Sequence, residues 1–194
     1  DTVAAAARKA VELTRSLGLA MSACLLPTVG NPNFDVPEGE MEIGMGIHGE
    51  PGVRRGPLLP ADEVADDLLD RILADGELAA GTELAVLVNG LGATPSEELH
   101  ILYRRVHHRL VDAGFGIRRA FVGEYATSLE MAGASISLLP LDDELAGYLD
   151  APADPPLTMA SGRGVRRAPP RISRSPCRRR PTPSSRRATS SASS

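Results

Sequence analysis

Residues 83–112 read "ELAVLVNGLGATPSEELHILYRRVHHRLVD" and decide the class of fold. The first part is a continuous apolar run that ends at an Asn-Gly pair, and such a run is typical of a strand covered on both faces, as in a parallel sheet. From about Pro95 to Asp112, apolar residues return at the spacing of a helix. A buried strand, a short loop and an amphipathic helix in succession indicate a layered α/β domain.

The same alternation of helix and strand extends in both directions. Further helices are predicted over residues 4–17, 60–73 and 142–152, with a single helical turn over 127–133. Further strands are predicted over residues 18–27, 41–49, 116–125 and 134–141. The expected fold is therefore α/β, a layered sheet with helices on its faces.

Composition limits the class of protein. The 194 residues are 42% hydrophobic, which is enough for one domain with a core of its own. No apolar run approaches the roughly 20 residues that cross a bilayer, and no secretory signal is visible, so we expect neither a membrane span nor secretion. Cys24 and Cys177 lie far apart in different surroundings, which argues against a disulfide framework and favours the cytoplasm.

Charge divides the chain into two parts. Residues 1–157 carry all 25 acidic residues and 11 of the 21 basic residues, whereas residues 158–194 carry ten arginines and no acid. This second part is rich in Arg, Pro and Ser, and we expect a disordered basic tail, because so few apolar residues cannot form a core. The tail is interpreted as a solvated linker or as frameshift-derived sequence rather than as a nucleic-acid or membrane-surface arm. Because the first residue is Asp1, the chain is either processed or begins inside a longer protein.

One short stretch indicates a site for a small molecule. Residues 42–52, "EIGMGIHGEPG", surround His48 with glycines, among them Gly46, Gly49 and Gly52. Glycine within an extended segment lets another backbone or a ligand come close. The residues alone therefore predict a small-molecule site whose use of His48 stays open, the alternative being an ordinary structural histidine.

Other candidate motifs favour structural roles. His100, His107 and His108 lie on one predicted helix without the carboxylate or cysteine spacing of a metal site, so they are interpreted as solvated positions. The loop "NGLGATP" follows a strand and opens a helix, where anions bind in some α/β sheets, but an ordinary tight turn is the preferred interpretation. The acids in "LDDEL" are interpreted as capping a helix.

The chain resembles the substrate-binding unit of the dihydroxyacetone (glycerone) kinases, the DhaK type. The resemblance is carried by "GLAMSACLLPTVGNPNF", "EIGMGIHGEPG", "LAVLVNGLGATPSEELHILYRRV" and "GEYATSLEMAGASISLLPLDDEL", and it covers residues 1–157. It implies that His48 bonds covalently to the carbonyl carbon of dihydroxyacetone as a hemiaminal. Gly46, Gly49 and Glu50 would then form the substrate-binding neighbourhood, and Glu50 could orient the ring.

The resemblance also implies a larger assembly. The chain corresponds to the C-terminal half of such a unit, and a preceding lobe would supply further substrate and acid–base residues. ATP-Mg or ADP-Mg is expected on a separate subunit or a fused domain, with no cofactor and no metal in this chain. The complete unit would be a cytoplasmic homodimer of glycerol metabolism, and this chain alone would be inactive as a kinase. A non-catalytic ketone-binding regulator and an inactive truncated product are the alternatives.

Overall fold

The computed structural model describes residues 2–24, 34–46, 51–76 and 78–152, which all belong to one compact unit. The predicted basic tail lies outside this part of the chain. The described helices and strands are, in chain order, α1 (Thr2–Leu13), β1 (Arg15–Ala20), β2 (Glu40–Ile43), β3 (Arg54–Pro57), α2 (Ala61–Ala74), β4 (Glu83–Gly90), α3 (Ser96–Asp112), β5 (Gly116–Gly123), β6 (Gly133–Leu141) and α4 (Asp143–Asp150).

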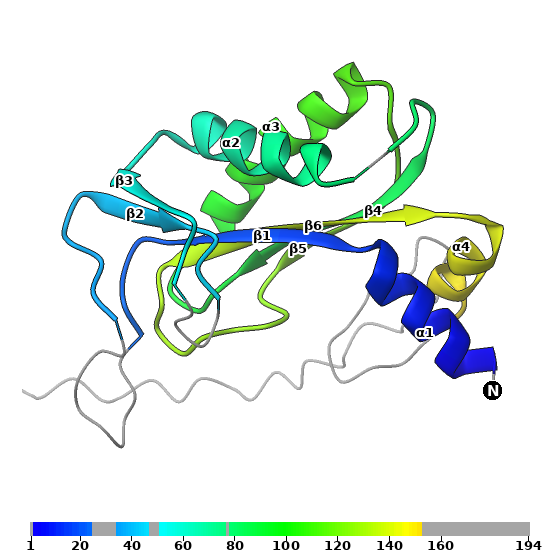
Figure 1. The fold of residues 1–194 in the computed structure, drawn as a ribbon, viewed down its shortest axis with the longest axis horizontal. Coiled ribbons are helices and arrows are strands. Elements are labelled where there is room, and N and C mark those ends of the chain that lie inside the picture. Colours follow the sequence, from blue (N-terminus) through cyan, green and yellow to red (C-terminus); the bar gives the residue numbers. More distant parts are fainter. Residues whose placement is uncertain (1, 25–33, 47–50, 77, 153–194) are drawn as a thin grey trace, which may run out of the picture. The chain divides into compact units, whose positions relative to one another are not determined.

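The described strands form one mixed sheet in the order β3-β2-β1-β6-β4-β5 (Figure 1). Strands β4 and β5 run parallel, and every other neighbouring pair in the sheet is antiparallel. Figure 1 shows α2 and α3 together on one face, with α1 and α4 near the end of β6 on the other face. The predicted α/β fold is confirmed, although the interior strand β4 has one parallel and one antiparallel neighbour instead of two parallel ones.

The core lies between the sheet and the α2–α3 layer. Leu17 of β1 pairs with Ile136 of β6, which in turn pairs with Val88 of β4, so their side chains form a row across three strands. Because successive side chains of a strand point to opposite faces, this row shares its face with Leu19 and Leu138, two positions along. These residues belong to one apolar cluster together with the inner sides of α2 and α3.

Both covering helices bury the faces that their spacing predicts. In α2 the buried residues include Val64, Leu68 and Ile72, at intervals of four. The buried residues of α3 are Leu99, Leu102, Val106 and Leu110, and Tyr103 packs partly buried against the same cluster. Residues at these spacings lie on one side of a helix, so burying them against the sheet is what stabilises each helix in the fold.

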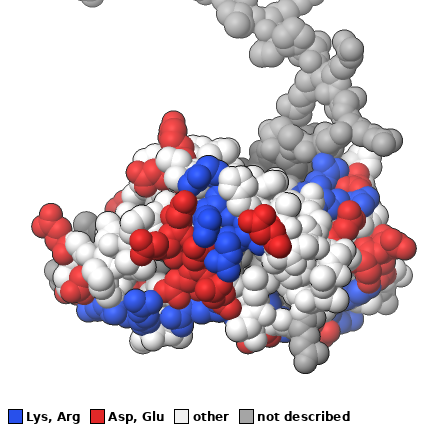
Figure 2. All heavy atoms as spheres, turned by 90° about the horizontal axis from the view of Figure 1, so that it is seen from above, with Lys and Arg blue, Asp and Glu red and all other residues white. Residues whose placement is uncertain are grey.

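Ion pairs join the outer surfaces of α2 and α3. Asp66 is central, because Arg105 binds its carboxylate through two nitrogens at 2.7 and 2.9 Å and Arg109 approaches it at 2.7 Å. Arg109 also reaches Asp70 at 2.6 Å. Figure 2 looks onto this side of the molecule and shows acidic and basic side chains interleaved there. Hydrogen bonds from Arg105, the stronger influence, and from Arg109 hold the pKa of Asp66 below its usual value.

Replacing Asp66 by asparagine should lower the free energy of unfolding at pH 7 by about 1 kcal/mol. Since the folded-state pKa of Asp66 is lowered, its stabilisation is present above the unfolded-state pKa of about 3.9 and disappears as the pH falls through the lower folded-state value. Urea unfolding at pH 7 and at pH 2 to 3 measures this, and the gap between the proteins should close in acid. Asp70→Asn, at a carboxylate that is 65% exposed, is the matched control and should change stability less. An equal gap at both pH values would contradict the prediction.

Two boundaries near the N-terminus differ from the sequence prediction. The helix expected over residues 4–17 ends at Leu13, and the strand expected over 18–27 begins at Arg15 and ends at Ala20. Arg15 pairs with Leu138 at the start of a six-residue ladder with β6. That long-range pairing, which local helix propensity cannot reveal, ends the helix early.

The prediction of a helical turn over residues 127–133 is wrong, because the segment forms a tight non-helical turn instead, in which Met131 donates its N–H to the carbonyl of Ser128 at 3.0 Å. Leu129 has φ of 52°, Met131 forms a parallel bridge with Gly92, and Gly133 already belongs to β6. Strand β3 was missed altogether. Its sequence Arg-Arg-Gly-Pro lacks apolar alternation, and none of its residues is buried, as suits an edge strand.

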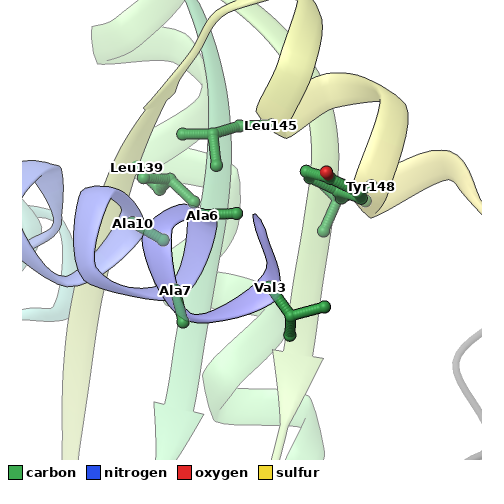
Figure 3. A pocket seen from close by; sticks show the side chains of 8 residues that line it. Val3, Ala6, Ala7, Ala10, Leu139, Leu145 and Tyr148 are labelled. Carbon is green, nitrogen blue, oxygen red and sulfur yellow. The ribbon is translucent and has the colours of Figure 1, made fainter. Parts of the chain in front are cut away.

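A shallow apolar groove lies between α1, α4 and β6. Figure 3 shows its lining, in which Ala6 and Ala10 of α1 face Leu139, Leu145 and Tyr148. Apart from the Tyr148 hydroxyl, these side chains offer no hydrogen-bonding group, so the groove does not suit a small polyhydroxy ketone.

None of the helices described is both long and apolar enough to cross a membrane.

Candidate functional site

Four segments that carry the sequence motifs meet in a second apolar cluster. Its buried members are Ala20, Cys24, Met45, Leu91 and Met131. Ala20 follows Leu19, which belongs to the main core, so this cluster lies on the sheet face opposite α2 and α3. Cys24 is buried as a free thiol. The structure thus gathers the ends of β1, β2 and β4 and the approach to β6 at one place.

The segment expected to bind the ketone extends from this cluster. His48, Gly49 and Glu50 lie outside the residues that the structure describes, and Gly46 is described and partly buried. What the structure gives is the chain on both sides of them. Met45 is anchored in the second cluster just before them, and β3 begins soon after them at Arg54.

The two ends of this connection lie side by side. Gly44 donates its N–H to the carbonyl of Gly18 at 2.7 Å, and Val53 donates to the carbonyl of Ile43 at 2.7 Å. Gly44 has φ of 81°, which favours glycine. At Gly52, an added Cβ would lie 2.5 Å from the Ile43 carbonyl oxygen, so that glycine is required by backbone packing. Backbone geometry therefore explains why Gly44 and Gly52 are glycines, without any need for a ligand.

The sequence alone did not mark Glu42 as a site residue. Its side chain holds together the two ends of the β2–β3 connection, Ile43–Gly44 and Gly52–Val53, which we call the neck. It is only 8% exposed, and its Oε1 accepts the N–H of Gly52 at 2.8 Å. Oε2 accepts two hydrogen bonds from Arg55, at 2.7 and 3.0 Å. The bonds from Arg55, followed by the one from Gly52, hold the pKa of Glu42 below its usual value. The available signal was an acid between Met41 and Ile43, both of which are apolar and buried.

The loop "NGLGATP" is a structural junction. The Asn89 side chain, 2% exposed, accepts the N–H groups of Tyr125 and Ala126 at 2.8 and 2.9 Å and donates to the Ala126 carbonyl at 2.9 Å. The Thr94 hydroxyl donates to the Gly133 carbonyl at 2.7 Å and accepts the Gly133 N–H at 2.9 Å. The backbone N–H groups of Leu91 and Ala93 also donate to the carbonyls of Gly133 and Met131, each at 3.2 Å, which supports the interpretation as a turn over that as an anion site.

Replacing Asn89 by alanine should lower the free energy of unfolding by about 2 kcal/mol, because the three partly buried hydrogen bonds that its buried side chain makes to Tyr125 and Ala126 are lost together. Urea denaturation followed by circular dichroism measures the change. Thr82→Ala is the control, because the Thr82 hydroxyl donates one exposed hydrogen bond to Ala79. If the two variants lose the same stability, the Asn89 bonds are not the constraint proposed.

The remaining candidate residues lie where the sequence analysis expected, on an exposed helix surface or at a helix start. His100, His107 and His108 are exposed on α3, as predicted. Among the described residues, no group of three His, Cys, Asp or Glu side chains could hold a metal ion. The acid cluster caps a helix as predicted, since the Asp142 carboxylate accepts the N–H of Leu145 at 2.9 Å at the start of α4.

The class is an α/β domain with a mixed sheet. Two helices cover one face of the sheet, and the connections that carry the sequence motifs gather on the other face. The chain belongs to the Dak1 domain family, whose sequence model matches residues 1–157.

Similar proteins share this segment. The dihydroxyacetone-binding subunit DhaK of PTS-dependent dihydroxyacetone kinase 2 from Listeria innocua is 48% identical over 156 residues, which are 80% of this chain and 47% of that subunit. An L-erythrulose kinase of Pectobacterium atrosepticum is 46% identical over 154 residues, 77% of this chain and 26% of the kinase. The chain therefore spans about half, or less, of the length of these curated relatives.

A solved structure has the same fold. The dihydroxyacetone kinase operon co-activator Dha-DhaQ superposes with a TM-score of 0.70 at 29% identity, over 77% of this chain and 47% of the co-activator. The proteins to which this chain is similar thus include ones named as kinases or kinase subunits and one named as an operon co-activator.

Proposed function

We propose that this chain is part of a dihydroxyacetone-binding unit of a glycerone kinase, and that His48 binds the ketone covalently. The observation that carries the proposal is the 48% identity to a dihydroxyacetone-binding subunit, which runs through the segment containing His48. The scaffold supports it, because the connection between β2 and β3 begins at the cluster where the other motifs meet.

The chemistry suits a small ketone. A lone pair of neutral imidazole adds to the carbonyl carbon, the carbon–oxygen π bond breaks, and the oxygen takes a proton while the ring loses its N–H proton. The product is a neutral tetrahedral hemiaminal, formed without any oxidant. Imidazole has an ordinary pKa near 6.5 and is mostly neutral at pH 7. Because polyols such as glycerol have no carbonyl, this bond selects ketones and holds the hydroxyl in place for phosphoryl transfer.

The names of the relatives support a proposal for the substrate class. Dihydroxyacetone and erythrulose share a hydroxymethyl group next to a ketone, and both appear in the names of close relatives. We take this hydroxymethyl ketone as the recognised unit, with Gly46, Gly49 and Glu50 as its neighbourhood. Glu50 is proposed to orient the imidazole.

The phosphoryl donor is proposed to lie on another component. ATP-Mg or ADP-Mg would be held by a separate subunit or a fused domain, and this chain alone would not turn over the ketone. Phosphoryl transfer depends mainly on positioning, so a unit that only fixes the acceptor hydroxyl can serve such a partner. The homodimer and the cytoplasmic location stay predictions.

A second candidate is a ketone-binding regulator, which the likeness to the operon co-activator favours. One experiment tests binding, and a second separates the two roles. Residues 1–157 replace the matching segment of the Listeria innocua subunit, and carbonyl-labelled dihydroxyacetone is followed by carbon-13 NMR. We expect a signal in the tetrahedral region, as for the unaltered subunit. If the unaltered subunit gives the signal and a folded chimera does not, the proposal is wrong. The remainder of the Listeria innocua subunit supplies the acid–base residues in this chimera. An adduct that is turned over to dihydroxyacetone phosphate with the partner subunit and donor therefore shows that residues 1–157 support phosphoryl transfer, whereas an adduct without turnover favours the regulator.

A further inference from the structure

Strand β3 is held at the sheet edge by polar contacts on its two faces. None of its side chains is buried, and its ladder with β2 is four residue pairs long. A ladder of this length at an edge contributes little stability by itself. On one face Arg54 binds Asp67 of α2 at 2.7 Å, and on the other Arg55 binds Glu42. Two neighbouring arginines thus tie one short strand to different parts of the domain.

The ion pair of Glu42 with Arg55 and the ion pair of Asp67 with Arg54 lie on opposite faces of the sheet. In the sheet register Ala20 pairs with Glu42, and Glu42 pairs with Arg55, so the three form a row across β1, β2 and β3. Ala20 belongs to the second cluster, where the motif segments meet. The carboxylate of Glu42 therefore lies on the same sheet face as the second cluster, whereas Asp67 lies on the helix-covered face.

Glu42 also reaches across the connection. Its two oxygens bind different parts of β3 and its approach, the N–H of Gly52 and the guanidinium of Arg55. Arg55 in addition donates to the carbonyl of Asp35 at 2.7 Å, in the segment that leads into β2. One buried carboxylate thus links the strand before the connection to the backbone directly after it.

We propose that Glu42 is a positioning residue, which holds the two ends of the β2–β3 connection together and thereby fixes how that connection presents His48 to a ketone. The inference rests on the proposed function for the role of His48. Its physical basis is the contact between the two ends of the connection: if Gly52 moves away from Glu42, Gly52 is no longer fixed relative to Met45. A displacement of about 1 Å at a reacting group can cost a factor of about 100 in reactivity.

The structure offers a matched pair of variants for the test. Arg55→Met and Arg54→Met each remove one arginine ion pair from β3, on opposite faces. Glu42→Gln keeps the size of the side chain but removes its charge. All are made in the chimera with the Listeria innocua subunit, and the fraction of labelled dihydroxyacetone in the tetrahedral form is titrated. We expect Glu42→Gln and Arg55→Met to weaken adduct formation about tenfold or more, and Arg54→Met to leave it within about twofold.

A second measurement is made on this chain without ketone. Amide hydrogen exchange at Gly52 should become at least about tenfold faster in Glu42→Met, which removes both acceptor oxygens at similar size, while exchange at core residues such as Val86 stays slow. Equal adduct formation in Arg55→Met and Arg54→Met, or unchanged exchange at Gly52, would overturn the proposal. Absence of any adduct in the unsubstituted chimera would overturn the proposed function instead, and the Gly52 exchange would still decide whether Glu42 holds the neck.

Discussion

Replacing Gly92 by alanine should lower the free energy of unfolding by about 3 kcal/mol or more. Gly92 has φ of 126°, where residues with a side chain are rarely found. An added Cβ would also lie 1.7 Å from the carbonyl oxygen of Leu129. Because the obstacle is backbone, one of the two segments must move, and the bridge between Gly92 and Met131 should break. Thermal and urea unfolding measure the loss.

Gly81→Ala is the matched control for this substitution. Gly81 also has a positive φ, of 85°, but an added Cβ there would meet nothing within 4 Å. It should therefore cost only the conformational strain, about 1 kcal/mol. The difference between the two variants isolates the close approach of the loop after β4 to the connection before β6. Equal losses would show that this approach does not occur in solution.

The parts of the fold that follow local periodicity were predictable. Val64, Leu68 and Ile72 mark the inner face of α2 by their spacing alone, and the predicted helix over 60–73 differs from Ala61–Ala74 by one residue at each end. The apolar run in β4 likewise marks a buried strand. In both cases the residues that decide the element are neighbours in the sequence.

The parts that depend on distant partners were not predictable. Nothing near Met131 indicates that it pairs with Gly92, and nothing in the sequence of β3 indicates a strand until Glu42 and Asp67 are placed beside it. The same holds for the candidate site. Glycines around His48 could be read as space for a ligand, whereas the carboxylate of Glu42 acquires a role only through contacts ten and thirteen residues away.

Strands set by local sequence patterns and contacts between distant residues both contribute to the candidate site. Gly92 and Asn89 fix the loop after β4 against the segment before β6, and Leu91 and Met131 from those segments pack with Met45. A rigid support of this kind is what a covalent site requires, because the nucleophile must be held in reach of the carbonyl carbon. The stability variants and the ligand variants therefore test the same arrangement from two directions.

Replacing His48 by alanine should remove the tetrahedral carbon signal of bound dihydroxyacetone completely, because no other group would form the carbon–nitrogen bond. The measurement uses carbonyl-labelled ketone and the chimera with the Listeria innocua subunit. Borohydride should fail to trap the adduct in the unsubstituted protein, since a ring nitrogen that has bonded to carbon has no second hydrogen to lose and cannot form an imine, as a lysine would. His107→Ala is the control: His107 is exposed on α3, with its ring centre 6.0 Å from that of Tyr103, and its loss should leave the signal intact. A signal that survives in His48→Ala would mean that another residue binds the ketone, and the glycines around His48 would then serve only the backbone geometry of the β2–β3 connection.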